Sequence, residues 1–390
     1  MSASTHFDIL IVGAGLSGAS LACALRGSRY RIGLLERQRP EWPADWDARI
    51  YAISPANVEF LQRCGAWAHL DAQRIAPVER MAVAGDAGGQ LVFSAYECGL
   101  QALAWIVESS AMARELWETA RRQPNIELIC PAQPESLVFD DDVARLRLAD
   151  GREISAGLVV GADGVNSWVR DQAAIPAELR PYGELGVVAN FTCAEPHFGT
   201  AFQWFRRDGV LAYLPLPGNR ISIVWSTPEA HAQELLALSP EAFASRVAQA
   251  GEGRLGRLEL LAPPAGFPLR LMKLDAIVAP RLALIGDAAH AVHPLSGHGI
   301  NLGFQDAREL ADQLLALPAF RDCGELAVLR RYQRARAEET LLVREMTDGL
   351  QRLFKPAFAP LALLRNAGMN LAGAIPPLRS ALARYAAGLL

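Results

Sequence analysis

The chain lacks any long uninterrupted run of apolar residues. Its 390 residues contain no stretch of about twenty of them, the length that a helix needs to cross the apolar core of a bilayer. The first six residues are mostly polar and a strand-like segment follows at once, so no secretory leader is recognisable. We expect a protein that neither spans a membrane nor is secreted.

Excess charge and clustered cysteines are also missing. Lys and Arg number 38 against 42 Asp and Glu, a formal net charge of -4. Nucleic acid requires a basic stripe or patch, so we exclude it as a partner. The six cysteines, at positions 23, 64, 98, 130, 193 and 323, form neither a C-x-x-C pair nor a metal-ligand spacing. We therefore predict no metal site, and free thiols in a reducing, cytoplasmic compartment.

What is present is enough apolar sequence, about half of the residues, for a large core and two domains. The chain opens with an apolar strand-like run at 7–12, then glycines, then a helix-like Ala and Leu stretch at 19–25. A second apolar run at 31–35 ends on Glu36 and completes a βαβ unit. The sequence therefore predicts a nucleotide-binding α/β unit at its start.

The remaining pattern predicts that this fold is interrupted by a β-rich insert. Further predicted elements are a helix at 109–122, strands at 137–148 and 153–161, antiparallel strands within 186–226, a buried strand at 282–285 and a helix at about 301–317. We predict an α/β fold with an α+β insert and a Rossmann-like domain built from discontinuous segments. The boundaries are 1–75, 100–175 and 270–340 for that domain, 76–99 and 176–269 for the β-rich domain, and 341–390 for C-terminal helices.

Three glycines form the first motif. Gly13, Gly15 and Gly18 give G-x-G-x-x-G between the first predicted strand and helix. The first glycine permits a tight turn, the second lets the backbone approach a pyrophosphate, and the third allows close helix–strand packing. Glu36 follows about twenty residues later, where a carboxylate accepts hydrogen bonds from a ribose. The glycines alone are also compatible with a turn that binds no ligand.

Two later motifs end an apolar strand with Asp and Gly. Asp163-Gly164 follows the strand at 153–161 and precedes Arg170, and Gly286-Asp287 follows the strand at 282–285. The carboxylate of Asp287 is placed to accept hydrogen bonds from sugar-like hydroxyls. Either segment alone is also compatible with a helix cap.

Together these motifs resemble the single-FAD aromatic hydroxylases, the class of para-hydroxybenzoate hydroxylase, over almost the whole chain. A closer resemblance is to the ubiquinone-biosynthesis hydroxylases within that class. It rests on ARIYAIS at 48–54, GVLAYLPL at 209–216 and HPLSGHGINLG at 293–303. The family usually has glutamine where this chain has His298.

The resemblance implies a bound FAD, NADH or NADPH as a transient electron donor, and O2 with an aromatic small molecule or lipid quinone as substrates. The β-rich insert would then be the substrate-binding domain. The FAD-binding residues that it implies are Gly13, Gly15, Gly18, Glu36, Arg49, Arg114, Asp163, Gly286, Asp287, Gly297, Gly299 and Asn301. Arg49 and Arg114 are equally compatible with ordinary surface charge.

The same resemblance suggests candidates for catalysis. Pro294 would lie against the reacting ring, His298 would lie near the flavin, and Tyr213 belongs to the aromatic residues of the insert. His298 and Tyr213 are also compatible with packing roles. The glycine loop before the helix near Asn301 would place N–H groups and the positive end of a helix beside the flavin pyrimidine edge, where reduced flavin is anionic.

The predicted function is an FAD-dependent monooxygenase that hydroxylates an aromatic ring, a polyprenylated phenol or quinone precursor in ubiquinone biosynthesis. The alternatives are a hydroxylase of a soluble phenol or secondary metabolite, and a non-oxygenating flavin-binding redox protein. A halogenase is disfavoured because no W-x-W-x-I-P segment is present.

The end of the chain carries a second open question. After Asp348 the residues are cationic and apolar, with no acidic residue. This tail would suit docking on an anionic membrane surface, at the inner face of the membrane, or within a complex of the ubiquinone pathway. The alternative is a helical hairpin that covers the FAD domain.

Overall fold

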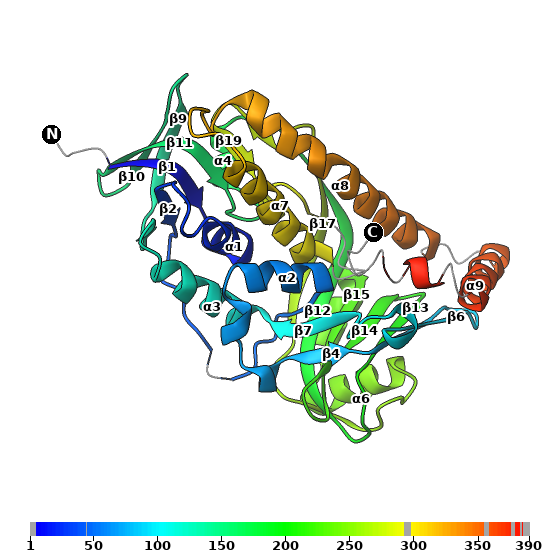
Figure 1. Cartoon of the computed structure of the whole chain (residues 1–390). Helices are drawn as coiled ribbons and strands as arrows, with labels where there is room; N and C mark the ends of the chain where they lie inside the picture. Colours follow the sequence, from blue (N-terminus) through cyan, green and yellow to red (C-terminus); the bar gives the residue numbers. More distant parts are fainter. Residues whose placement is uncertain are drawn as a thin grey trace.

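The computed structural model describes residues 5–43, 45–291, 298–354, 359–375, 379–382 and 384. Among these residues the strands form two large sheets and one small sheet between them (Figure 1). No helix in these ranges combines the length and the apolar character that crossing a bilayer requires.

The first sheet contains the βαβ unit that the sequence predicts. Its elements include β1 (Thr5–Val12), α1 (Leu16–Ala24), β2 (Ile32–Leu35), β8 (Ile126–Ile129), β11 (Glu153–Gly161), β18 (Val278–Ala279) and β19 (Leu282–Leu284). The strand order is β18-β19-β11-β1-β2-β8, and β19, β11, β1, β2 and β8 run parallel. β9 (Pro134–Phe139) and β10 (Ala144–Leu148) extend it from β11 by antiparallel pairing. Strands far apart in sequence thus end at one edge.

Helices bury the parallel strands, which explains their continuous apolar runs. α1 packs against α3 (Ser109–Arg121) and α7 (His298–Leu315). α7 is the helix predicted at 301–317, and it begins three residues and ends two residues earlier than predicted. The short helix α4 (Trp168–Gln172) follows β11. These elements form one core with the strands of the first sheet.

The second sheet is the predicted β-rich insert. Its strands are β5 (Arg80–Ala84), β6 (Gln90–Ser94), β12 (Ala177–Cys193), β13 (Thr200–Arg206), β14 (Gly209–Leu216), β15 (Arg220–Pro228), β16 (Leu258–Leu260) and β17 (Ala265–Leu274). The order is β16-β12-β15-β14-β13-β5-β6, with β17 paired to β12, and every pair is antiparallel except β5 with β13. α5 (Glu229–Leu236) and α6 (Pro240–Ala250) pack on one face.

A small sheet joins the two large ones. β3 (Ile50–Ile53), β7 (Ala104–Glu108) and β4 (Ala76–Val78) pair in that order, and α2 (Pro55–Arg63) follows β3. Ile50 and Ile106 pack with Leu214 and Leu216 of β14 in one apolar cluster. The β-rich sheet therefore turns the face opposite α6 toward the small sheet.

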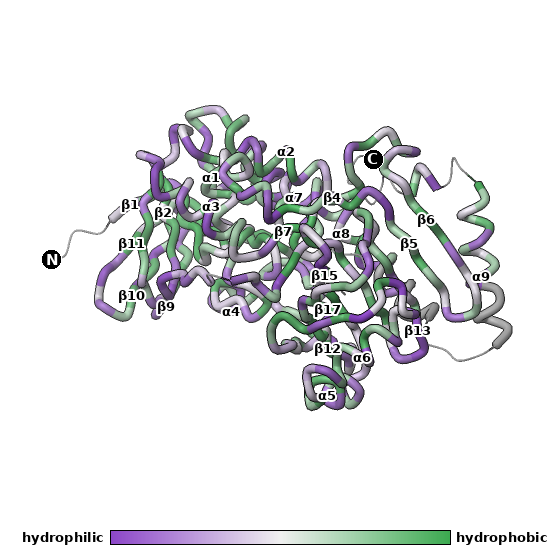
Figure 2. The backbone as a smooth tube through the Cα atoms, turned by 90° about the horizontal axis from the view of Figure 1, so that it is seen from below, coloured by the Kyte–Doolittle hydropathy of each residue, from purple (hydrophilic) through white to green (hydrophobic). Residues whose placement is uncertain are grey.

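The C-terminal helices differ from the prediction. α8 (Leu326–Phe354) runs without a break through the boundary expected at 341, and α9 (Ala359–Ala374) follows it. Figures 1 and 2 agree in placing α9 beside β6, at the end of the molecule opposite β9 and β10. A hairpin that covers the FAD domain is therefore wrong for α9, because its partner is the edge of the β-rich sheet.

Candidate functional site

The glycine motif forms the turn between β1 and α1. Gly13 has a φ of 103°, and a Cβ there would lie 2.4 Å from the carbonyl oxygen of Ala162. A Cβ on Gly18 would lie 2.0 Å from the carbonyl oxygen of Gly13. Gly15 differs, because no atom lies within 4 Å of its Cβ position at the start of α1. Two glycines are thus needed for packing, and the third leaves open space at a helix N-terminus, where anions bind.

Glu36 lies beside this turn. Its Oε2 accepts a hydrogen bond from the Ala14 N–H at 2.9 Å, and its Oε1 accepts one from the Arg37 N–H at 2.8 Å. The residue follows β2, whose parallel neighbour β1 leads into the glycines. The carboxylate is therefore held at the glycine turn, as the spacing from Gly13 suggests.

The second motif is part of a helix cap. Asp163 accepts hydrogen bonds from the Val169 N–H at 3.0 Å and from the Ser167 hydroxyl at 2.5 Å, at the start of α4. Arg170 is buried and donates to the carbonyl oxygens of Val165 and Ala288, at 3.0 and 3.3 Å. The capping geometry is present, and Arg170 ties this motif to the third one.

The third motif meets the other two. Gly286 has a φ of 60°, and a Cβ there would lie 2.5 Å from the Ser17 Oγ of α1. The Ile285 N–H donates to the Gly161 carbonyl oxygen at 3.0 Å. All three motifs therefore converge at the carboxyl ends of β1, β11 and β19, the edge where nucleotides bind in parallel sheets.

Asp287 and Arg49 are charged, exposed residues near this edge. The Asp287 side chain is open to solvent but recessed among protein atoms. This partial removal from water raises the pKa of its carboxyl group, against the attraction of His290 and Arg49. Arg49 is exposed. The two side chains are thus near enough to influence each other and are both available to a ligand.

A loop before β3 holds Arg49 in place. The Asp47 carboxylate accepts hydrogen bonds from the N–H groups of Arg49 and Ser110, at 2.8 and 3.0 Å. Its own N–H donates to buried Glu108 at 2.7 Å, and its carbonyl accepts from Asn190 of the β-rich sheet at 2.9 Å. Sequence reasoning missed Asp47, although an Asp two residues before an Arg is a recognisable turn signal.

The other predicted flavin ligands fall into different environments. Asn301 is buried, accepts from the Ser54 N–H and the Asn57 Nδ2, and donates to the Ala52 carbonyl, so it anchors α7 to β3 and α2. Gly299 has open space at its Cβ position. The Arg114 side chain is 61% exposed and lies 3.9 Å from Glu115, an arrangement typical of surface charge.

Three predicted residues fall where the side chains are not described. Pro294 and Gly297 lie outside the described residues, and of His298 only the backbone, the first residue of α7, belongs to them. Their roles stay predictions.

The structure does not bring Tyr213 to this edge. Its ring is buried among Trp204 and the residues of α6, and its hydroxyl donates to the Val247 carbonyl at 2.6 Å. Its neighbour Leu214 points to the small sheet instead. Because side chains alternate along a strand, Tyr213 faces away from the nucleotide-binding edge, which corrects the expectation of a catalytic role.

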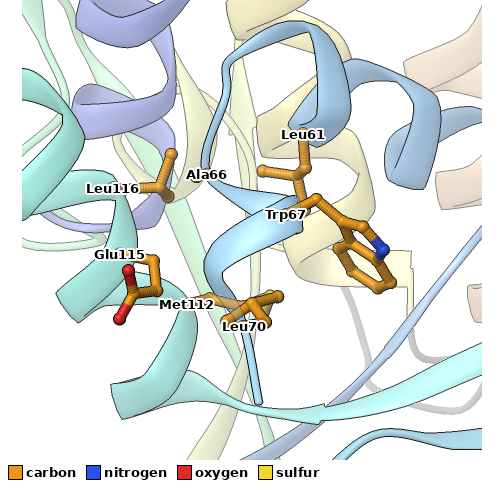
Figure 3. A pocket seen from close by; sticks show the side chains of 7 residues that line it. All are labelled: Leu61, Ala66, Trp67, Leu70, Met112, Glu115 and Leu116. Atoms are coloured by element: carbon orange, nitrogen blue, oxygen red, sulfur yellow. The ribbon is translucent and has the colours of Figure 1, made fainter. Parts of the chain in front are cut away.

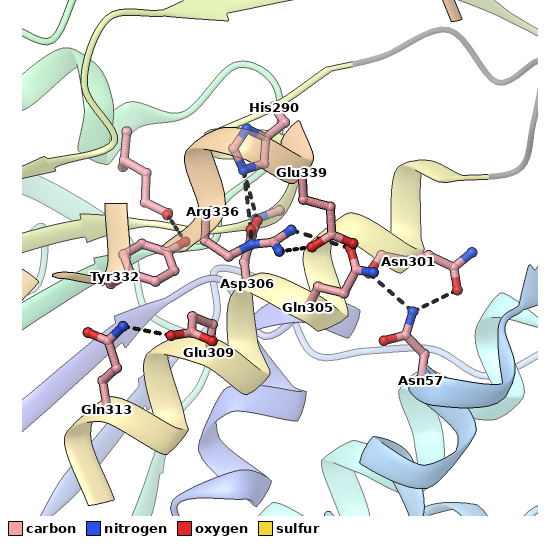
Figure 4. Close-up of polar contacts among 12 residues, drawn as sticks. Asn57, His290, Asn301, Gln305, Asp306, Glu309, Gln313, Tyr332, Arg336 and Glu339 are labelled. Atoms are coloured by element: carbon pink, nitrogen blue, oxygen red, sulfur yellow. Dashed lines mark hydrogen bonds and ion pairs between the residues drawn. The ribbon is translucent and has the colours of Figure 1, made fainter. Parts of the chain in front are cut away.

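Sequence reasoning also missed a buried ionic cluster behind the third motif. Asp306 of α7 is fully buried and accepts from the Gly286 N–H at 2.9 Å, and Arg336 of α8 donates to it at 2.8 Å (Figure 4). The signal that could have found it is an acid on the apolar stripe of the predicted helix at 301–317, flanked by Phe304 and Leu310.

A small recess between α2 and α3 does not belong to this site (Figure 3). It is lined by Leu61, Ala66, Trp67, Leu70, Met112, Glu115 and Leu116. None of these residues comes from the three motifs, and all but Glu115 are apolar. In the described part of the chain, no group of three or more His, Cys, Asp or Glu side chains is placed to hold a metal ion.

The residues at the edge fit FAD. The open space at Gly15 suits a pyrophosphate, and the exposed carboxylate of Asp287 suits sugar-like hydroxyls. The FAD binding domain family matches residues 6–344. The fold and this edge define a flavin-dependent monooxygenase.

Comparison with known proteins shows to which family of flavin-dependent monooxygenases the chain belongs. The chain is 34% identical to ubiquinone hydroxylase UbiL of Rhodospirillum rubrum, over 100% of this chain and 91% of that protein. It is 33% identical to the 3-demethoxyubiquinol 3-hydroxylase of Escherichia coli, over 98% of each. It also matches the structure of PqsL from Pseudomonas aeruginosa in complex with 2-aminobenzoylacetate, with a TM-score of 0.78 and 26% identity over 94% of this chain and 99% of that one. The chain belongs to the ubiquinone-biosynthesis hydroxylases, a family of FAD-dependent monooxygenases.

Proposed function

We propose that this monooxygenase hydroxylates the ring of a polyprenylated phenol or quinol precursor of ubiquinone, with NADH or NADPH as electron donor. The observation that carries the proposal is similarity over the whole chain to two proteins named for ubiquinone chemistry. The convergence of the three motifs supports it, because it provides the flavin site that the reaction requires.

In this proposal each motif holds one part of FAD. The open space at Gly15 and the N-terminus of α1 receive the pyrophosphate, and Glu36 accepts from the adenosine ribose. Asp287 accepts from the ribityl hydroxyls, and Arg49 compensates negative charge nearby. Asp163 and Asn301 act through the turns that they hold.

Bound FAD supplies the redox chemistry with O2. The chain contributes the N-terminus of α7, whose N–H groups and dipole would stabilise negative charge close to that end of the helix. Pro294 would orient the ring of the substrate and His298 would lie at the start of α7. The remaining task of the protein is to hold the ring in a space from which water is excluded.

The test is genetic complementation of a strain blocked at one ring-hydroxylation step. Expression of this chain should restore ubiquinone in one such strain, and mass spectrometry should show that the accumulated precursor disappears. Failure in strains blocked at each of the ring positions, with folded and flavin-loaded protein present, would contradict the substrate class.

A second candidate substrate is a soluble aromatic compound. PqsL, 26% identical, has been crystallised with 2-aminobenzoylacetate, which is a small aromatic acid rather than a lipid. Comparing NAD(P)H oxidation with a prenylated phenol and with water-soluble phenols separates the two candidates, because each substrate accelerates flavin reduction only where it fits.

We also infer that the C-terminal region docks on an anionic membrane surface, where a polyprenylated substrate resides. Exposed apolar side chains gather around α9 and the turn after β6: Tyr96, Leu371, Ile375 and Leu382. Arg379 pairs with Glu97 at 2.8 Å and so joins these segments, while Arg384 stays exposed. Apolar side chains flanked by cations suit an anionic interface.

Vesicle flotation tests this docking. Binding should require phosphatidylglycerol, be absent with phosphatidylcholine alone, and fall strongly in Leu371→Asp. Phe320→Asp, at an even more exposed apolar residue in the segment after α7, is the control and should bind as the parent does. Equal binding of both variants would exclude the C-terminal region as the docking surface.

A further inference from the structure

The turn at Gly286 is held from behind by two residues of α8. The Tyr332 hydroxyl donates to the Leu284 carbonyl oxygen at 2.9 Å, just before the turn. Arg336 lies one helical turn later and donates through Nε to Asp306, which accepts from the Gly286 N–H (Figure 4). One face of α8 thus fixes the backbone on both sides of Ile285.

Asp306 is the centre of this arrangement. Its carboxylate is fully buried and receives the Gly286 N–H at 2.9 Å, the Arg336 Nε at 2.8 Å and the His290 Nε2 at 3.1 Å. Arg336 is also buried and pairs with Glu339 at its outer side. A buried carboxylate is tolerated only when such partners replace water, so the cluster holds together as a unit.

The turn at Gly286 is also restricted on the side that faces α1. At Gly286 a Cβ would lie 2.5 Å from the Ser17 Oγ, so α1 is in close contact there. The His290 N–H closes the turn on the Gly286 carbonyl oxygen at 2.8 Å. Among the described residues none donates a hydrogen bond to the Asp287 carboxylate, which is open to solvent. Its direction therefore depends on how Gly286 is held.

We propose that Asp306 is a positioning residue for the flavin: its carboxylate, held by Arg336, fixes the Gly286 N–H and so directs the Asp287 carboxylate toward the ribityl chain. The proposal rests on the proposed contact between Asp287 and FAD. Asp306 itself lies behind the turn and acts only through Gly286 and His290. Precise placement of a binding group depends on partners of this kind.

The test compares Asp306→Asn with a matched control. Asparagine keeps the size of the side chain, but Arg336 donates to Oδ1 and Gly286 to Oδ2, and the amide replaces one of these oxygens with an NH2 donor. Asp86→Asn disrupts another ion pair whose side chains are little exposed, Asp86 with Arg365, between α9 and the hairpin of β5 and β6. Both variants should lower the melting temperature, which is the effect of any broken buried pair.

Flavin measurements separate the two variants. Asp306→Asn should raise the FAD dissociation constant by roughly tenfold or more, the size of effect that loss of a supporting partner has at metal sites, and shift the visible spectrum and midpoint potential of the bound flavin. Asp86→Asn should leave all three unchanged. Wild-type flavin binding and spectrum in Asp306→Asn, or an equal loss in Asp86→Asn, would overturn the proposal.

Arg336→Lys covers the case in which Asp306→Asn does not fold. It keeps the positive charge beside Asp306 but loses the planar guanidinium, so a smaller change in the same direction is expected. An unchanged dissociation constant and spectrum would overturn the proposal. If Asp287→Ala lost FAD while Asp306→Asn and Arg336→Lys kept it, only this inference would fail. A parent protein that bound FAD but hydroxylated no aromatic ring would instead contradict the proposed function.

Discussion

Two buried ion pairs of the same chemistry lie at opposite ends of the C-terminal helices. Arg336 with Asp306 joins α8 to α7, and Arg365 with Asp86 joins α9 to the hairpin of β5 and β6. All four side chains are buried. What distinguishes the pairs is a further partner, since Asp306 also accepts from the backbone N–H of Gly286 in the third motif, whereas Asp86 also accepts from Asn366, which lies on α9 beside Arg365.

Burial and pairing alone therefore do not reveal what a charged residue is for. Each pair stabilises the fold, because removing one partner leaves the other charge buried without water or a counterion. The further partner of each pair indicates its role: Asp306 binds the Gly286 N–H beside Asp287, which suggests cofactor placement, whereas Asp86 binds Asn366 of α9, which indicates docking of that helix. Variants on the two sides of the molecule test this separation.

The largest effect is expected at the glycine turn on the flavin side. Gly15→Val should give protein without detectable FAD, because the side chain would fill the space assigned to the pyrophosphate, while the melting temperature of the apoprotein changes little. Gly368→Val on α9, where space is also open, is the control and should retain FAD. A Gly15→Val protein with stoichiometric flavin would contradict the site.

Asp287→Ala should weaken FAD binding by about tenfold to a hundredfold, the loss expected for hydrogen bonds to a charged group. Its fold should persist because the side chain is exposed. Fluorescence titration with FAD measures the change, with Asp142→Ala at a remote exposed carboxylate as the control. Equal affinities in the two variants would remove Asp287 from the site.

On the α9 side, Asn366→Ala should act on stability alone. Its Oδ1 accepts from the Gly89 N–H at 2.8 Å, and the loss of a buried partner costs about 1–3 kcal/mol. Urea unfolding should show this decrease with the FAD dissociation constant unchanged. A large loss of FAD affinity would show that α9 influences the flavin site and would contradict a purely structural role for the Arg365–Asp86 pair.

The contribution of Asp306 to the stability of the fold should depend on pH. Burial opposes its ionisation, but His290 and Arg336 outweigh that and hold the pKa of its carboxyl group below the ordinary value. The folded state then binds fewer protons here than the unfolded state, so the contribution is complete above about pH 4 and is lost as pH falls through the lowered pKa. Asp306→Asn should therefore lose less stability than the parent as the pH falls from about 4 toward the lowered pKa. Parallel pH curves would argue against an ionised Asp306.

The smallest effect is expected for His298→Gln, at the first residue of α7. The resemblance places glutamine at this position in related proteins, so FAD content and turnover should stay close to those of the parent. Normal flavin content with collapsed hydroxylation would instead make His298 a catalytic residue.

The sequence predicted those parts of the site that local spacing encodes. The glycine turn, Glu36 and Gly286-Asp287 each follow a recognisable strand, and parallel strands bring such ends together. Asp306 could not be predicted in the same way, because its partners Gly286 and Arg336 become neighbours only when α7 and α8 pack.

Two other features of the sequence take their meaning only from the tertiary structure. The sequence left Tyr213 open to a catalytic or a packing role, because an aromatic residue in a strand can face either way, and the folded sheet places it against α6. The tail after Asp348 has basic but no acidic residues, yet Arg365 and Arg379 pair with acids from residues 86 and 97 in the folded chain. Charge along a sequence does not show which charges remain free after folding.

The most direct test of the central claim follows oxygen from O2 into the product. Protein loaded with FAD is given NADH or NADPH, a short-chain prenylated phenol and isotopically labelled O2, and the mass of the organic product is measured by mass spectrometry. We predict one labelled oxygen atom on the ring of the product. Consumption of the nicotinamide donor by flavin-loaded protein without label in any aromatic product would contradict this claim.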